Sequence, residues 1–87
     1  MKKAYLRCLK KEDEEFADEY VVIIPLTDGT VESGSVNKEH FNERGHLQVK
    51  IIEDYGDRAI VLLPRKINKR DSVTVSTNLL YWPKTDS

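Results

Sequence analysis

The residues best suited to metal binding or acid–base chemistry are the two histidines, His40 and His46, with Glu39 and Glu43 beside them. Zinc sites use His or Cys ligands in closely spaced pairs, and two ligands on one helix need the i, i+4 spacing. Positions 40 and 46 do not have that spacing. We therefore interpret both as solvent-facing histidines at the ends of a surface helix, and we predict no metal and no other cofactor.

No other reactive side chain has neighbours that would activate it. Cys8, the single cysteine, has no base nearby in the sequence, and a lone cysteine in a strand is typically a small buried hydrophobic residue. The serines lack the G-x-S-x-G pattern, and the four glycines are scattered rather than gathered into a phosphate-binding loop. The acidic run Glu12–Glu15 lacks the central glycine of a calcium loop. We therefore predict that the protein is not an enzyme.

The dense basic segment of the chain is Arg65–Arg70, RKINKR. Because a rigid β scaffold positions its loops, such a loop is a common place for ligand binding. Tyr81 and Trp82, if they lie near it, add rings on which bases stack, the combination that single-stranded nucleic acid prefers. The candidate contact residues are Arg65, Lys66, Lys69, Arg70, Tyr81 and Trp82. The alternative is a solvated loop whose cations neutralise the acidic run 12–19 of the same molecule.

Composition narrows the choice of partner. The 87 residues include 14 basic and 15 acidic side chains, a net charge of −1, whereas duplex-DNA-binding proteins usually have a large basic excess. The single cysteine excludes an internal disulfide. We find no secretion signal, no lipidation motif and no apolar run of the roughly 20 residues that span a bilayer. We therefore expect a cytoplasmic protein that does not bind membranes.

Short apolar runs separated by turn residues predict the elements that must position these side chains. From Tyr20 to Val36, an apolar strand, an Asp28-Gly29 turn and a returning strand follow one another. Strands are predicted near residues 4–9, 20–26, 30–36, 47–54, 58–64 and 72–76, with a short helix at 38–44. Residues 1–87 are predicted to form a single small β domain. Its fold class is mainly β: a small antiparallel, SH3-like or similar barrel of about six strands with one short helix.

Alternation within the strands predicts which side chains face the core. The expected core residues are Val22, Ile24, Val49, Ile51, Ile60, Leu62, Val73 and Val75. The runs 21–26 and 59–63 are apolar on both faces, so which set of alternate residues faces inward in them stays open. Phe16 is expected to anchor the acidic loop into the core. Asn78–Trp82 is expected to fold back and plug one end of the barrel.

Three functions follow from these patterns. The first is a non-catalytic interaction module that binds a protein partner, or a copy of itself, through an edge strand or an aromatic groove. The alternative is a nucleic-acid-binding barrel that uses loop 65–70 with Tyr81 and Trp82. A weaker third hypothesis is a small enzyme or metal protein centred on His40 and His46. Salt separates the first two, since phosphate binding weakens steeply with salt and apolar binding does not.

Overall fold

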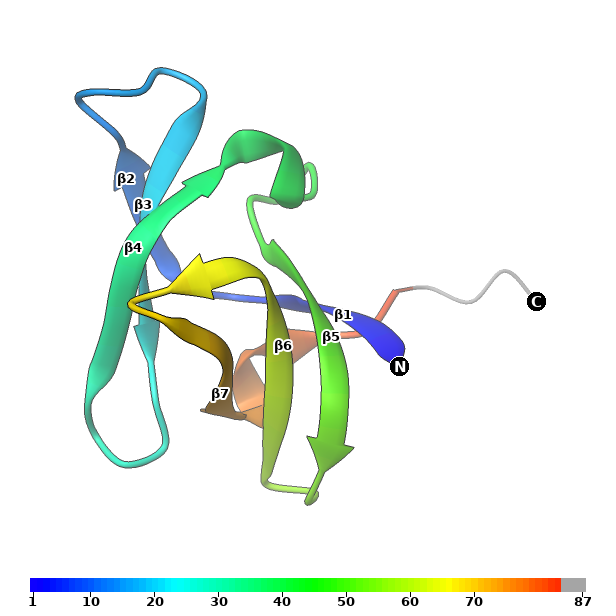
Figure 1. The fold of residues 1–87 in the computed structure, drawn as a ribbon. Helices are drawn as coiled ribbons and strands as arrows, with labels where there is room; N and C mark the ends of the chain where they lie inside the picture. Colours follow the sequence, from blue (N-terminus) through cyan, green and yellow to red (C-terminus); the bar gives the residue numbers. More distant parts are fainter. Residues whose placement is uncertain (84–87) are drawn as a thin grey trace.

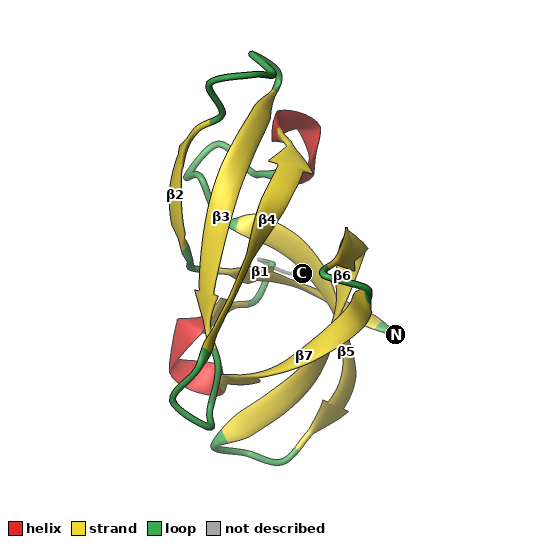
Figure 2. Ribbon diagram, turned by 60° about the vertical axis from the view of Figure 1, so that its left-hand side comes forward, coloured by secondary structure: helices red, strands yellow, loops and turns green. Residues whose placement is uncertain are grey.

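The computed structural model describes residues 1–83 and contains two antiparallel sheets (Figures 1 and 2). The strands are β1 (Lys2–Leu6), β2 (Leu9–Glu12), β3 (Glu19–Pro25), β4 (Val31–Asn37), β5 (Leu47–Asp54), β6 (Arg58–Ile67), β7 (Arg70–Ser76) and β8 (Leu80–Tyr81). The larger sheet has the order β7-β6-β5-β1-β8 and curls into a half-barrel, while the smaller sheet has the order β2-β3-β4. The predicted mainly β, antiparallel fold is confirmed, with eight strands rather than about six. Residues 84–87 of the predicted domain lie outside the described part of the chain.

The β3–β4 hairpin follows directly from the turn chemistry of the sequence. Gly29 has a φ of +89°, a conformation that a side chain would strain. The Asp28 carboxylate accepts hydrogen bonds from the backbone N–H of Thr30 (2.9 Å) and from its hydroxyl (2.6 Å). These bonds fix the turn, and β3 and β4 then pair from Pro25↔Val31 to Glu19↔Asn37.

The first predicted strand, 4–9, is in fact two strands in different sheets. β1 ends at Leu6 and pairs with β5, whereas Leu9–Glu12 forms β2 and pairs with β3. Between them the backbone N–H of Arg7 donates to the carbonyl of Leu79 (2.8 Å), so the chain leaves the first sheet through a contact with the C-terminal segment. The acidic stretch therefore begins as a strand, and it contains no helical turn.

The predicted helix at 38–44 is wrong: only one 3-10 turn forms, η1 (Lys38–His40). Asn37 caps it by accepting from the N–H of Glu39 (2.9 Å), but Phe41 is extended and forms a β-bridge with Leu47. Phe41 also packs edge-to-face on Tyr20, with ring centroids 5.0 Å apart. Packing of Phe41 on the core thus ends the helix after a single turn. The other helical segment, η2 (Thr77–Leu79), is equally short, and in residues 1–83 no helix is long and apolar enough to cross a membrane.

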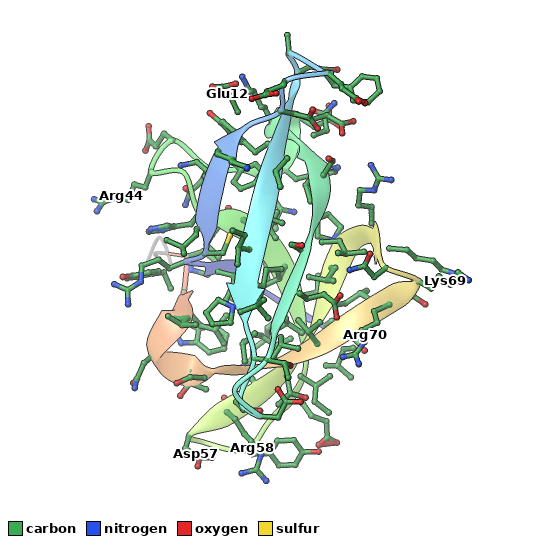
Figure 3. All side chains as sticks on the ribbon, turned by 90° about the vertical axis from the view of Figure 1, so that its left-hand side faces the viewer. Glu12, Arg44, Asp57, Arg58, Lys69 and Arg70 are labelled. Carbon is green, nitrogen blue, oxygen red and sulfur yellow. The ribbon has the colours of Figure 1, made fainter. Side chains whose placement is uncertain are left out.

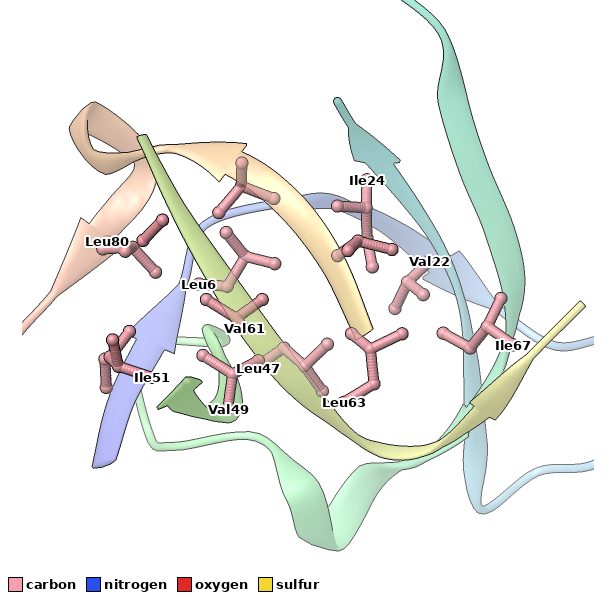
Figure 4. Packing of buried hydrophobic residues seen from close by; sticks show 14 of the residues in the cluster. Leu6, Val22, Ile24, Leu47, Val49, Ile51, Val61, Leu63, Ile67 and Leu80 are labelled. Carbon is pink, nitrogen blue, oxygen red and sulfur yellow. The ribbon is translucent and has the colours of Figure 1, made fainter. Parts of the chain in front are cut away.

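One hydrophobic cluster lies between the two sheets (Figure 4). The predicted core residues Val22, Ile24, Val49, Ile51, Val73 and Val75 are buried. Ile60 and Leu62 are only half-buried, and Ala59, Val61 and Leu63 face inward in their place.

Pairing explains the error in β6. Val61 lies opposite both Ile51 and Val73, and directly opposed residues point to the same face of a sheet. Since Ile51 and Val73 face inward, Val61 must do so as well. A bulge in β5 between Ile51 and Glu53 leaves Ile52 exposed.

Fewer residues of the C-terminal segment Asn78–Trp82 pack on the core of the half-barrel than predicted. Leu80 is buried and Leu79 packs against the core, which confirms that the segment folds back. Tyr81 and Trp82 are exposed instead, with 42% and 49% of their surface accessible. Phe16 is 54% exposed, so the expectation that it anchors the acidic loop in the core is wrong.

Candidate functional site

An open hollow of about 540 Å³ lies beside β8, and aromatic side chains gather in it. Tyr5 of β1 and Tyr81 of β8 are direct cross-strand neighbours, so both project to the same face. His46, just before β5, and Trp82, just after β8, complete the aromatic walls. We call this region the aromatic hollow.

The loop 42–46 forms the polar side of the aromatic hollow. Asn42 organises it: its side-chain carbonyl accepts from the N–H groups of Arg44 (3.0 Å) and His46 (2.9 Å), and its own N–H donates to the His46 carbonyl (3.0 Å). This compact turn brings Arg44 and Glu43 to the wall of the hollow. The hydrogen bonds of Asn42 thus hold the loop 42–46 and position the ring of His46.

His46 is not the solvent-facing residue that the sequence suggested. Its ring stacks on Tyr81, with centroids 4.5 Å apart and planes 4° from parallel. Its Nδ1 atom is buried and has no hydrogen-bond partner among residues 1–83. Burial lowers the pKa of the imidazole, and the charges of Arg44, Arg7 and Lys10 lower it further. The ring is therefore held in its neutral form.

Arg44 lines the aromatic hollow beside Glu43, and two further cations lie near it. Arg7 follows β1, and Lys10 belongs to β2 with its Nζ beside Gly45 of the loop 42–46. All three cations lower the pKa of His46. Within the described part of the chain, none of them forms an ion pair with a carboxylate. Together they supply positive charge beside exposed rings.

The predicted basic loop lies at the tip of the β6–β7 hairpin, where Arg65, Lys66, Lys69 and Arg70 are all exposed. We call residues 65–70 the basic tip. The Nε of Arg70 lies 3.3 Å from a carboxylate oxygen of Glu32 in β4. Asn68 donates to the other Glu32 oxygen (2.6 Å) and to the Ser33 carbonyl (3.0 Å).

The basic tip is therefore fastened to β4. The alternative interpretation of the sequence, in which its cations neutralise the acidic run 12–19, is wrong. The ion pair of that run is between Glu12 and Lys38, with N and O 2.6 Å apart. Charge balance within the molecule is local, and each partner comes from a neighbouring strand or turn.

The basic tip does not lie near Tyr81 and Trp82. β7 and β8 are at opposite ends of the strand order, and the seven residues of β7 extend about 20 Å from the tip toward η2. Figure 3 shows Lys69 and Arg70 on the opposite side of the molecule from Arg44. The six residues predicted to share a surface thus divide into two separate places.

The candidate metal and nucleophile residues are not brought together. His40 lies near Glu39, with Nε2 and Oε1 3.8 Å apart, while His46 belongs to the aromatic hollow. In residues 1–83 no group of three His, Cys, Asp or Glu side chains is arranged to hold a metal ion. Burial raises the pKa of the Cys8 thiol to about 11, so this thiol is protonated at neutral pH and a weak nucleophile.

Comparison with protein-family models, curated proteins and solved structures found no match to this chain. The residues of this region that sequence reasoning missed are Tyr5, Arg7, Lys10 and Arg44, and His46 was considered only for metal binding or acid–base chemistry. The alternation of Tyr5 and Arg7 on one face of the first strand was a signal for two of them. No local pattern marks Arg44 or His46 as part of an aromatic surface.

Proposed function

We propose that the protein is a non-catalytic interaction module that binds another protein chain, either a different protein or a copy of itself, through the aromatic hollow. The observation that carries the proposal is the exposure of Tyr81 and Trp82 at the rim of a concave surface. Tyr, Trp and Arg side chains supply most of the energy at protein interfaces, and concave sites shield those contacts from water. The aromatic hollow offers all three residue types.

The apolar surface continues past Trp82. This residue also borders a second hollow, of about 460 Å³, together with Met1, Ile51 and Ile52. Met1 and Ile52 are exposed. Contiguous exposed apolar surface is typical of an interaction site, and an area extending over two hollows fits a polypeptide better than a small ligand. A cytoplasmic location away from membranes remains part of this proposal.

Binding of single-stranded nucleic acid is the second candidate, and one observation favours it. The stacked rings of His46 and Tyr81 lie beside Arg7, Lys10 and Arg44, so rings and cations meet as they do in single-strand sites. These cations take the role that the sequence suggested for the basic tip. The balanced net charge of −1 weighs against it, because it gives no long-range attraction for a polyanion.

Selection from a displayed peptide library tests the proposal. We expect peptides enriched on the wild-type protein to lose binding to Trp82→Ala and to keep binding to Tyr55→Ala. Tyr55 is a matched control because it is 51% exposed and lines neither of the two hollows. In parallel, single-stranded and duplex oligonucleotides are titrated at low and moderate salt. Failure to enrich any peptide, together with saturable, steeply salt-dependent oligonucleotide binding, would replace the first function by the second.

A further inference from the structure

The acidic loop between β2 and β3 presents an aromatic side chain on a fixed backbone. The Asp13 carboxylate accepts from the N–H groups of Glu15 (2.8 Å) and Phe16 (3.3 Å) and from the hydroxyl of Ser35 (2.8 Å). The carbonyl of Phe16 accepts from the N–H of Glu19 (3.1 Å). Although its backbone is held in this way, the Phe16 side chain is 54% exposed. An ordered loop loses little conformational freedom on binding, so Phe16 is well prepared to insert into a partner.

Two of the carboxylates around Phe16 lack partners: in residues 1–83 neither Glu14 nor Glu15 forms an ion pair. Asp18 also flanks Phe16 and accepts a hydrogen bond from the side-chain amide of Asn37 (3.4 Å). The aromatic hollow has the opposite property, since it combines exposed rings with Arg44 at its wall and with Arg7 and Lys10 nearby, and none of these cations forms an ion pair within residues 1–83. The two surfaces are therefore complementary in both charge and apolar character.

These two surfaces do not meet within one molecule. The loop projects from the end of the three-stranded sheet, away from β1 and the C-terminal segment (Figures 1 and 2). Phe16 and Trp82 are both exposed, which a contact between the surfaces would prevent. Any contact between them must form between two molecules.

We propose that the aromatic hollow binds the acidic loop 13–18 of a second copy of this chain, with Phe16 against the aromatic rings and its flanking carboxylates near Arg7, Lys10 and Arg44. This inference rests on the proposed function and names its partner. The loop and the hollow are different surfaces, so the contact is heterologous. If two molecules bind each other's loops reciprocally, the assembly is a closed dimer. Otherwise, each copy binds the next and the assembly is an open chain.

Sedimentation velocity over a range of protein concentrations tests this contact. We expect concentration-dependent association of the wild-type protein, weakened about tenfold or more by Phe16→Ala and by Arg44→Glu. Trp82→Ala serves as a second hollow variant, and Tyr55→Ala as the control that leaves association unchanged. Far-ultraviolet circular dichroism establishes that each variant is folded.

Mixing the variants gives the sharper result. Phe16→Ala keeps an intact hollow and Arg44→Glu keeps an intact loop, and each alone should associate about tenfold or more weakly than the wild-type protein. Their equimolar mixture should form a 1:1 complex that goes no further, because only one loop and one hollow remain. Raised salt should weaken that complex, since carboxylates and cations face one another in it.

Several results would overturn this inference. A wild-type protein that stays monomeric at the highest concentration would do so, as would association that neither Phe16→Ala nor Arg44→Glu changes. If the protein is monomeric but peptides selected on the hollow still require Trp82, the proposed function stands and the self-association fails. If the protein binds neither peptides nor its own copies but binds single-stranded oligonucleotides, both proposals fall.

Discussion

The basic tip and the aromatic hollow both carry cations, but the chain encodes them differently. The cations of the basic tip lie within six consecutive residues, whereas those at the hollow come from two distant stretches, Arg7 and Lys10 from one and Arg44 from the other. Beneath the tip, Ile67 is buried and Asn68 bonds to β4, so the hairpin acts as a fastener between the two sheets. The dense run of charges along the chain belongs to the structural region, whereas the residues of the proposed binding region come together only in the folded protein.

The surroundings of the two regions explain why we assign them different roles. A ligand site needs a concave wall with apolar contacts as well as charge. The hollow that includes Arg70, of about 360 Å³, is lined by Leu26, Thr27, Asp28, Arg58 and Thr74 in addition, with no aromatic ring among them. The aromatic hollow has three aromatic residues and an imidazole at its walls.

Removing the anchor beneath the basic tip should have the largest effect on stability. Ile67 is 2% exposed, and Ile67→Ala leaves a cavity at the contact between the sheets. We expect the free energy of unfolding to fall by about 2–4 kcal/mol, measured by urea denaturation. Ile52→Ala is the matched control, because Ile52 is exposed and its change should be small. An unchanged midpoint for Ile67→Ala would mean that the tip does not fasten the sheets.

Filling the space above Ile67 should destabilise the same contact by less. A Cβ at position 34 would lie 2.8 Å from the Cγ2 of Ile67, which is attached directly to Cβ and cannot swing aside. We expect Gly34→Ala to lower the free energy of unfolding by about 1–3 kcal/mol. The double variant Gly34→Ala/Ile67→Ala, in which the clashing Cγ2 is removed, measures the coupling between the two positions. Simple additivity in that cycle would contradict direct contact.

Such contacts show why the fold was more predictable than the site. Alternation in β5 and β7 identified Val49 and Val75 as inward residues, and the Asp28-Gly29 turn identified a hairpin. In β6 both faces are apolar, so only the pairing of Val61 with its neighbours decides which face is buried. Pairing register depends on residues distant in sequence, and local patterns do not contain it.

The aromatic hollow depends even more on distant pairing. It requires β8 to lie against β1, so that Tyr81 meets Tyr5, and it requires loop 42–46 to place His46 on Tyr81. Trp82 was recognised as a contact candidate because its ring offers a stacking surface. Its neighbours were not, since they come from three other segments of the chain.

Acid should destabilise the aromatic hollow through His46. Because the folded protein holds the pKa of His46 below its ordinary value, the fold favours the neutral ring. This contribution is fully present above the ordinary pKa of about 6.5 and is lost as the pH falls from there through the lower folded value. We expect the free energy of unfolding to fall between pH 7.5 and pH 5 by less than the Gly34→Ala change, and His46→Phe to reduce that slope.

Two measurements check the assignment to His46. A nuclear magnetic resonance titration of the imidazole reports its pKa directly, and Tyr81→Ala should raise that pKa toward its ordinary value, because Tyr81 stacks on the ring. The control His40→Gln leaves His46 in place and should therefore retain the slope. Equal slopes for His46→Phe and the wild-type protein would show that the hollow does not respond to protonation.

Substitutions in the basic tip itself should change the free energy of unfolding least. Replacing Lys66, Lys69 and Arg70 by Ala removes three exposed cations and the one ion pair with Glu32. Exposed pairs contribute little, so the free energy of unfolding should change by roughly a few tenths of a kcal/mol.

Replacing Arg7, Lys10 and Arg44 by Ala changes the net charge by the same amount and serves as the matched comparison. If the hollow is the binding site, the Arg7/Lys10/Arg44 variant loses partner or oligonucleotide binding, and the variant of the basic tip keeps it. If phosphates instead bind at the tip, the first triple variant flattens the salt dependence of oligonucleotide binding by up to about 3 units, and the roles of the two regions are reversed.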